Sequence, residues 1–121
     1  EPLGPVVKYG DQQWSDIVRW AVYVIFIAEE MGIDSTNIDR YANNIDPNIQ
    51  RFMGELNGAD HPHLGDKLGI DGKWSYYIIK QVGNYEEIFE RNVGPNSKIG
   101  LQRGLNKLYS DGGLLYAPPL K

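Results

Sequence analysis

Residues 11–32 read DQQWSDIVRWAVYVIFIAEEMG, and this stretch decides the fold. Asp11 is suited to be an N-cap, because its carboxylate can accept a hydrogen bond from a free amide of the first turn. Gly32 can take the left-handed conformation that ends a helix without the penalty of a Cβ atom. The sequence therefore predicts one helix that begins after Asp11 and runs to Met31.

This predicted helix is unusually apolar. After Arg19 it has no polar face from Trp20 to Ala28, which is more than two turns. A helix that is apolar all round must be covered on several sides, and each large side chain left in water would cost roughly 1.5–3 kcal/mol. The apolar run is too short for membrane insertion, which needs about 20 helical residues. We therefore predict that the helix either self-associates or packs against something missing from these residues. The residues expected to make this contact are Trp20, Val24, Ile25, Phe26 and Ile27.

The segments after Gly32 carry short helix signals: capping residues, apolar stripes with a spacing of three or four, and glycine or proline at the ends. They predict five helices. The first is capped by Ser35 or Thr36 and runs through Ala42, the second starts at Asp46 and Pro47, and the third covers 74–82. The fourth starts at the capping-box residues Asn84 and Glu87, and the fifth includes Leu101, Leu105, Leu108 and Tyr109. Residues 57–65 are predicted to be a loop, residues 2–9 an extended connection or short strand, and the tail from residue 114 extended. The chain is thus predicted to be mainly α, with one long buried helix, several short helices and at most one or two short strands.

Composition and charge exclude several classes of function. The chain has 121 residues, a net charge of −4 and no cysteine. Its twelve Lys and Arg residues form no basic stripe, so we expect no nucleic-acid partner. Without cysteine the chain can have neither a disulfide framework nor a thiolate metal site. We expect no cofactor.

The histidine-containing cluster comprises Asp60, His61, His63 and Asp66. Two imidazoles and a carboxylate can bind zinc, but zinc ligands need to be held by secondary structure and by further hydrogen-bonding partners. These residues lie in a proline-containing loop, and a solvated polar loop is the favoured interpretation. We therefore predict no metal site, with His61 and His63 as the alternative ligands.

Two groups of carboxylates are candidates for acid–base pairs. Glu29 and Glu30 lie in the last turn of the long helix, and Glu86, Glu87 and Glu90 lie in a later helix. Paired acids need partial burial to separate their pKa values, whereas acids in a first turn stabilise a helix through its dipole. Together with the absence of a nucleophile motif, this predicts no catalytic residue and no enzyme. A small glycan hydrolase that uses the glutamates is the minor alternative.

Four stretches in this order resemble the C-terminal portion of one family, the periplasmic solute-binding proteins of general L-amino acid ABC transporters. They are EPLGPVV (1–7), GDQQW (10–14), QVGNYEEIFERNVG (81–94) and GGLLYAPP (112–119). The resemblance covers nearly the whole chain. Only residues 43–63 look less typical, and NGADHPH (57–63) within them resembles a local insertion.

The resemblance implies a parent with a two-lobed α/β fold that closes around an L-amino acid by a hinge motion and delivers it to an ABC permease in the periplasm. It implies that the main ligand-binding groups lie before Glu1, so the 121 residues alone are not expected to bind an amino acid. The chain would be a single C-terminal segment: 1–10 a return hinge and strand, 11–31 the long helix on the first lobe, and 33–121 a helical extension. The implied hinge residues are Glu1, Pro2, Leu3, Gly4 and Pro5.

A second interpretation stays open. The chain is then a standalone acidic helical interaction module that forms a homo-oligomer through the helix over residues 11–31 and binds no amino acid.

Overall fold

A computed structural model describes residues 3–56 and 63–120. These residues are mainly helical, as predicted, and their only strand-like pairing is one parallel bridge between Leu108 and Leu115. The elements, in chain order, are α1 (Gln12–Glu30), the 3₁₀ helix η1 (Ile38–Tyr41), α2 (Pro47–Met53), α3 (Leu64–Leu68), α4 (Trp74–Val82), α5 (Tyr85–Asn92) and the 3₁₀ helix η2 (Tyr109–Asp111).

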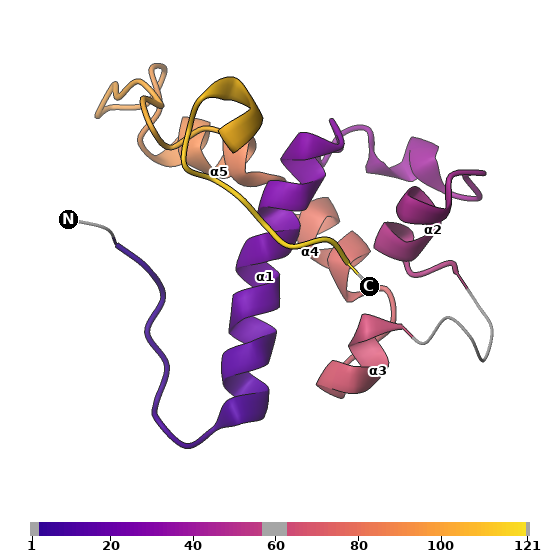
Figure 1. Ribbon diagram of the computed structural model, residues 1–121. Coiled ribbons are helices and arrows are strands. Elements are labelled where there is room, and N and C mark those ends of the chain that lie inside the picture. Colours follow the sequence, from indigo (N-terminus) through magenta and orange to yellow (C-terminus); the bar gives the residue numbers. More distant parts are fainter. Residues whose placement is uncertain (1–2, 57–62, 121) are drawn as a thin grey trace.

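Helix α1 is the central element, and the other helices lie around it (Figure 1). It begins as predicted, because the Asp11 carboxylate accepts a hydrogen bond from the Trp14 amide at 2.9 Å. It ends at Glu30, one residue before the predicted Met31, and Gly32 has a φ of 68°. Helices α3, α4 and α5 all pack against it. The long apolar helix is thus partly covered by this chain's own later segments.

One continuous hydrophobic core follows from this packing. It is built around the α1 residues Val24, Ile27 and Ala28. The other buried members are Ile33, Ile38, Phe52, Met53, Leu68, Trp74, Ile79, Ala117 and Leu120. The core therefore draws on almost every described element and on the segment near the C-terminus.

The segment over residues 114–120, which we call the C-terminal strap, is extended, as Pro118 and Pro119 predict. It crosses α1 in Figure 1, and the buried side chains of Ala117 and Leu120 join the core. The C-terminal strap, which is not helical, thus completes the hydrophobic core that the helices form.

Local capping signals predicted two more helix starts correctly. The Asp46 carboxylate accepts from the Asn48 amide at 2.8 Å, with Pro47 at the first position of α2. Asn84 and Glu87 form both hydrogen bonds of a capping box at the start of α5. In each case the donor and acceptor are at most three residues apart, so the sequence alone contains the interaction.

Two predictions between α1 and α3 were wrong. The expected helix through Ala42 is only the 3₁₀ turn η1, and its start is organised by Asp34, whose carboxylate accepts from the amides of Thr36 and Asn37 at 2.8 Å. The predicted loop over residues 57–65 ends too late, because α3 already begins at Leu64. Residues 57–62 of that loop lie outside the described residues.

The predicted last helix through residues 101–109 was also wrong. This stretch is irregular and ends in the short turn η2. Gly100 and Gly104 have φ values of 68° and 52°, in the left-handed region that interrupts a right-handed helix. The spacing of the leucines fits a helical stripe, but Leu101 and Leu105 are exposed and only Leu108 is buried.

Candidate functional site

The first candidate site, the pair Glu29 and Glu30, proves to be mainly structural. The Arg103 guanidinium donates to both carboxylate oxygens of Glu29, at 2.5 and 3.1 Å. The Glu29 side chain is 8% exposed and that of Arg103 20%. Arg103 also lies over the rings of Tyr85 and Phe89, 5.4 and 5.8 Å from their centroids. Glu29 therefore joins α1 to α5 and to the segment after it.

The glutamates of α5 have comparable roles. Glu87 accepts from the Ser35 amide at 3.1 Å, from the Ser35 hydroxyl at 2.5 Å and from the Asn84 amide at 2.8 Å. Glu90 accepts from both the backbone and the side-chain nitrogen of Asn96. Glu87 thus holds the loop after α1 against the start of α5, and Glu90 holds the turn after α5. Neither contact resembles an acid–base pair that faces a substrate.

The histidine cluster is only partly visible. Asp60 and His61 lie outside the described residues, and His63 precedes α3 with its ring against Gly72. Within residues 3–56 and 63–120, no group of three or more potential ligands is arranged to hold a metal ion.

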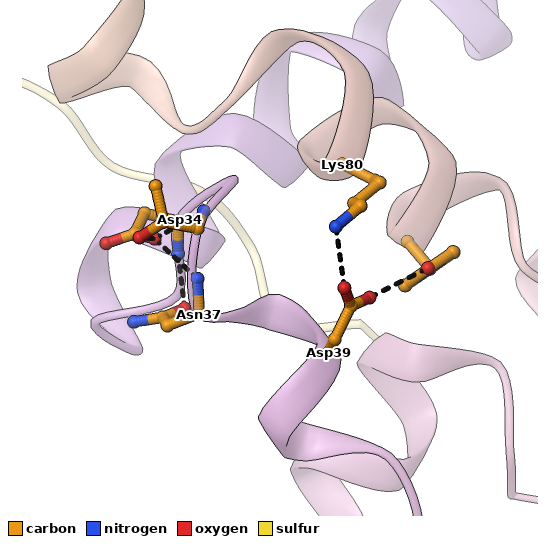
Figure 2. A network of polar contacts seen from close by, with 6 residues as sticks. Asp34, Asn37, Asp39 and Lys80 are labelled. Carbon is orange, nitrogen blue, oxygen red and sulfur yellow. Dashed lines mark hydrogen bonds and ion pairs between the residues drawn. The ribbon is translucent and has the colours of Figure 1, made fainter.

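A polar network joins η1 to α4 (Figure 2). The Lys80 ammonium donates to one Asp39 carboxylate oxygen at 2.6 Å, and the Tyr76 hydroxyl donates to the other at 2.9 Å. The hydrogen bond from Lys80 and then that from Tyr76 lower the pKa of Asp39, and Asp39 in turn raises the pKa values of Tyr76 and Lys80. The network is exposed and links two elements. Asp39 and Tyr76 also line an open pocket of about 310 Å³.

Two open pockets flank α1. One, of about 410 Å³, lies between the end of α1, α2 and the C-terminal strap, and its lining includes Ile27, Arg51, Tyr116 and Leu120. The other, of about 300 Å³, lies between the segment before α1 and one side of that helix. Its lining is mostly apolar and includes Pro5, Val7, Val18 and Val22. This second groove shows that one side of α1 lacks close packing against the rest of the chain.

The residues predicted for self-association divide into two groups. Val24 and Ile27 are buried by the chain itself, whereas Trp20, Ile25 and Phe26 are partly exposed. Of the predicted hinge residues, Leu3 and Gly4 are exposed and precede α1 without regular structure, and Glu1 and Pro2 lie outside the described residues. Both assignments remain predictions.

The fold matches that of a known class of protein. It superimposes on part of a solved structure, an ABC transporter periplasmic binding protein from Brucella ovis with glutathione bound, with a TM-score of 0.88 and 41% identity. The match covers 95% of this chain and 35% of the Brucella chain. The described residues therefore have the fold of one portion of a periplasmic binding protein.

Curated relatives match over the whole of this chain. They include the putative amino-acid ABC transporter-binding protein YhdW of Escherichia coli K12 (49% identical), the general L-amino acid-binding periplasmic protein AapJ of Rhizobium johnstonii (47%) and the glutamate/glutamine/aspartate/asparagine-binding protein BztA of Rhodobacter capsulatus (46%). The chain spans about a third of their length, 34% of YhdW and 35% of AapJ and BztA. No family model matches the chain. The chain is a partial homologue of amino-acid ABC transporter-binding proteins, which confirms the resemblance found in the sequence.

The search for membrane-spanning segments gave a negative result for the described residues, where no helix combines the length and hydropathy needed to cross a bilayer.

Sequence reasoning missed Arg103, which pairs with Glu29 on α1 and lies over two rings of α5. A basic residue after α5 carries no local signal for a partner on α1. The one available hint was Glu29, a carboxylate in the last turn of a helix, where the dipole disfavours an anion and a cationic partner stabilises it.

Proposed function

We propose that this chain is part of a periplasmic amino-acid-binding protein that captures L-amino acids and passes them to an ABC permease. The observation that carries the proposal is 46–49% identity over all of this chain to three proteins named as amino-acid-binding or transporter-binding. The relatives are solute-binding transport proteins, and we infer that this chain has no enzymatic activity.

Within such a protein, residues 1–10 would be the return hinge and strand, residues 11–31 the helix on the first lobe, and residues 33–121 the C-terminal extension. The exposed side chains of Leu3 and Val6 and the apolar groove along Val18 and Val22 support this division. Apolar surface of this kind is stabilised by burial, at about 25 cal/mol per Å². The missing portion of the parent is the partner we propose for it.

These 121 residues alone are expected not to bind amino acids. An amino acid needs a cationic group for its carboxylate and an anionic group for its ammonium. The most buried pair of that kind, Arg103 and Glu29, is already joined in an ion pair. We infer that the groups that hold the ligand lie in the portion of the parent before Glu1.

A chimera tests the proposal. The third of E. coli YhdW that matches this chain is replaced by the 121 residues, and binding of a mixture of L-amino acids is measured by calorimetry for the chimera, for YhdW and for the isolated chain. We expect submicromolar to micromolar binding by the chimera and by YhdW (on the order of −8 kcal/mol at 1 μM), and none by the isolated chain. A chimera that folds, as judged by circular dichroism, and fails to bind what YhdW binds would contradict the proposal.

The second candidate is the standalone interaction module. It is favoured by one observation, the partial exposure of Trp20, Ile25 and Phe26 on α1. Sedimentation velocity of the isolated chain tests this candidate: a folded monomer at micromolar concentration excludes it, and a dimer that Ile25→Asp dissociates is required for it.

A further inference from the structure

All the sulfur of this chain lies in two side chains. The sequence has no cysteine and two methionines, Met31 and Met53. Peroxides oxidise a methionine thioether to the sulfoxide, a polar group that disrupts apolar packing. The surroundings of the two methionines therefore decide where an oxidant can modify the chain.

The two methionines differ in how open they are to solvent. Met53, at the end of α2, is 3% exposed and belongs to the core. Met31, directly after α1, is half-buried and lines the open pocket of about 410 Å³ between α1, α2 and the C-terminal strap. A water molecule takes up about 30 Å³ in the liquid, so a molecule as small as hydrogen peroxide fits easily into this pocket. Peroxide can thus approach Met31, whereas Met53 offers it almost no surface.

The Met31 side chain lies where the C-terminal strap meets the core. The pocket that it lines is also lined by Ile27 of α1 and by Ala117 and Leu120 of the strap. These three residues belong to the core, and Met31 packs against that core. Its backbone is fixed, because the Met31 amide donates to the Ile27 carbonyl at 3.0 Å. A chemical change of this side chain therefore takes place among apolar side chains of α1 and the strap.

The end of the C-terminal strap is held by apolar contacts. Its first two residues, 114 and 115, form backbone hydrogen bonds with residues 105–109. Within the part of the chain that the structure describes, residues 116–120 form no hydrogen bond, and two of them are prolines, which have no amide hydrogen to donate. Burial of Ala117 and Leu120 therefore keeps this end in place, and a polar group beside them weakens its attachment.

We propose that Met31 is the oxidation site of this chain and that its sulfoxide loosens the C-terminal strap. The Met31 sulfur attacks one oxygen of hydrogen peroxide; the S–O bond forms as the O–O bond breaks, and the second oxygen leaves as water. Sulfur is oxidised by two electrons and the peroxide is reduced. The sulfoxide is polar, so the apolar side chains of the strap lose a favourable neighbour.

The missing portion of the parent, which we propose above as the cover for other apolar surface, is the obvious candidate to shield this pocket. The pocket, however, is walled by α1, α2, η2 and the strap of this chain itself. Figure 1 shows α2 and the segment before α1 on opposite sides of α1. Under the proposed function the missing portion joins the chain through that segment. We therefore expect Met31 to stay accessible when the missing portion is present.

Peroxide treatment of the 121-residue chain tests the site. Mass spectrometry of peptides, after increasing times in hydrogen peroxide, gives the initial rate of oxidation of each methionine. We expect the Met31 sulfoxide to form at least about tenfold faster than the Met53 sulfoxide, because oxidation follows exposure. Equal rates, or faster oxidation of Met53, would overturn the proposal.

Melting temperatures with and without peroxide test the effect on the strap. The original chain should lose about 3–6 °C on oxidation. Met31→Leu, a substitution close in volume, should lose nothing, and the control Met53→Leu should lose as much as the original chain. No loss in the original chain, or the same loss in Met31→Leu, would overturn the proposal.

Leu120→Ala shows whether the sulfoxide acts through the strap. This variant already lacks the buried side chain near the end of the strap. Because the two changes then affect the same contact, oxidation should lower its melting temperature by less than about half of the loss in the original chain. A full loss in Leu120→Ala would show that the sulfoxide acts elsewhere and would contradict the proposal.

The YhdW chimera shows whether the missing portion covers the pocket. We expect Met31 to be oxidised in the chimera at a rate similar to that in the isolated chain. A rate at least about tenfold lower would show that the missing portion shields Met31, and would overturn the proposal for the whole protein. This measurement follows modification of Met31 and not amino-acid binding, so its failure is distinguishable from failure of the proposed function.

Discussion

Arg103 and Glu29 are 74 residues apart in sequence, yet their side chains form a two-point ion pair at 2.5 and 3.1 Å. A planar guanidinium facing both oxygens of a carboxylate is among the stronger charge-assisted contacts in proteins. The same guanidinium lies over two aromatic rings of α5. One side chain therefore connects α1, α5 and the segment after α5.

Breaking this pair from one side should be costly. Arg103→Met leaves the buried Glu29 carboxylate without its cation and should lower the free energy of unfolding in urea by about 2–3 kcal/mol, less than for a fully buried pair because Arg103 is partly exposed. Adding Glu29→Gln to that variant should recover part of the loss. Arg19→Met, which breaks the exposed pair with Asp16, should cost less than about 1 kcal/mol. Equal effects at Arg103 and Arg19 would contradict this.

The Glu87 carboxylate should matter more than its neighbour in the same turn. Glu87→Ala removes the capping-box contact to Asn84 and both contacts to Ser35. We expect a loss of about 2–3 kcal/mol in the free energy of unfolding. The control Glu86→Ala removes an exposed first-turn anion and should cost less than about 1 kcal/mol.

Acid should weaken the link between η1 and α4. Hydrogen bonds from Lys80 and Tyr76 hold the pKa of Asp39 below its ordinary value of 3.8. The stability that Asp39 contributes is therefore fully present above that value and is lost as the pH falls through the lower folded-state pKa. Melting temperatures measured from about pH 6 to about pH 2.5 should fall less steeply in Asp39→Asn than in the original chain.

The partner variant checks the same link from the other side. Lys80→Met should flatten the acid dependence in the same way, because it removes the first cause of the lowered pKa of Asp39. If both variants follow the original curve, the network contributes nothing to stability in acid.

The C-terminal strap should stabilise the core. Leu120→Ala removes a buried side chain that packs with the α1 residues of the core, and we expect a loss of about 2–3 kcal/mol in the free energy of unfolding. Leu114→Ala, in the same segment but exposed, should change it by less than about 0.5 kcal/mol. A similar loss in both variants would show that the strap acts through something other than core burial.

The features that were predicted correctly depend on contacts within a few residues. Asp11 contacts the amide of Trp14, and Asn84 contacts that of Glu87, so sequence alone contains both donor and acceptor. The resemblance to amino-acid transporter-binding proteins was also visible in short motifs. The relatives are 46–49% identical to this chain over its whole length.

The features that were missed depend on the folded chain. The partner of Glu29 comes from the segment after α5, and that of Glu87 from the loop after α1. The leucine stripe over residues 101–108 fits a helix, but Gly100 and Gly104 take left-handed conformations and Arg103 is drawn to α1.

The C-terminal strap also fixes an order of events during synthesis. Ile27 and Leu120 share one core, and the ribosome makes about 90 residues between them, which takes roughly 5–20 s at about 5–20 residues per second. Throughout that time α1 lacks the side chains of the C-terminal strap that complete the core around it. The nascent chain therefore presents its longest helix to chaperones well before it can complete the core around that helix.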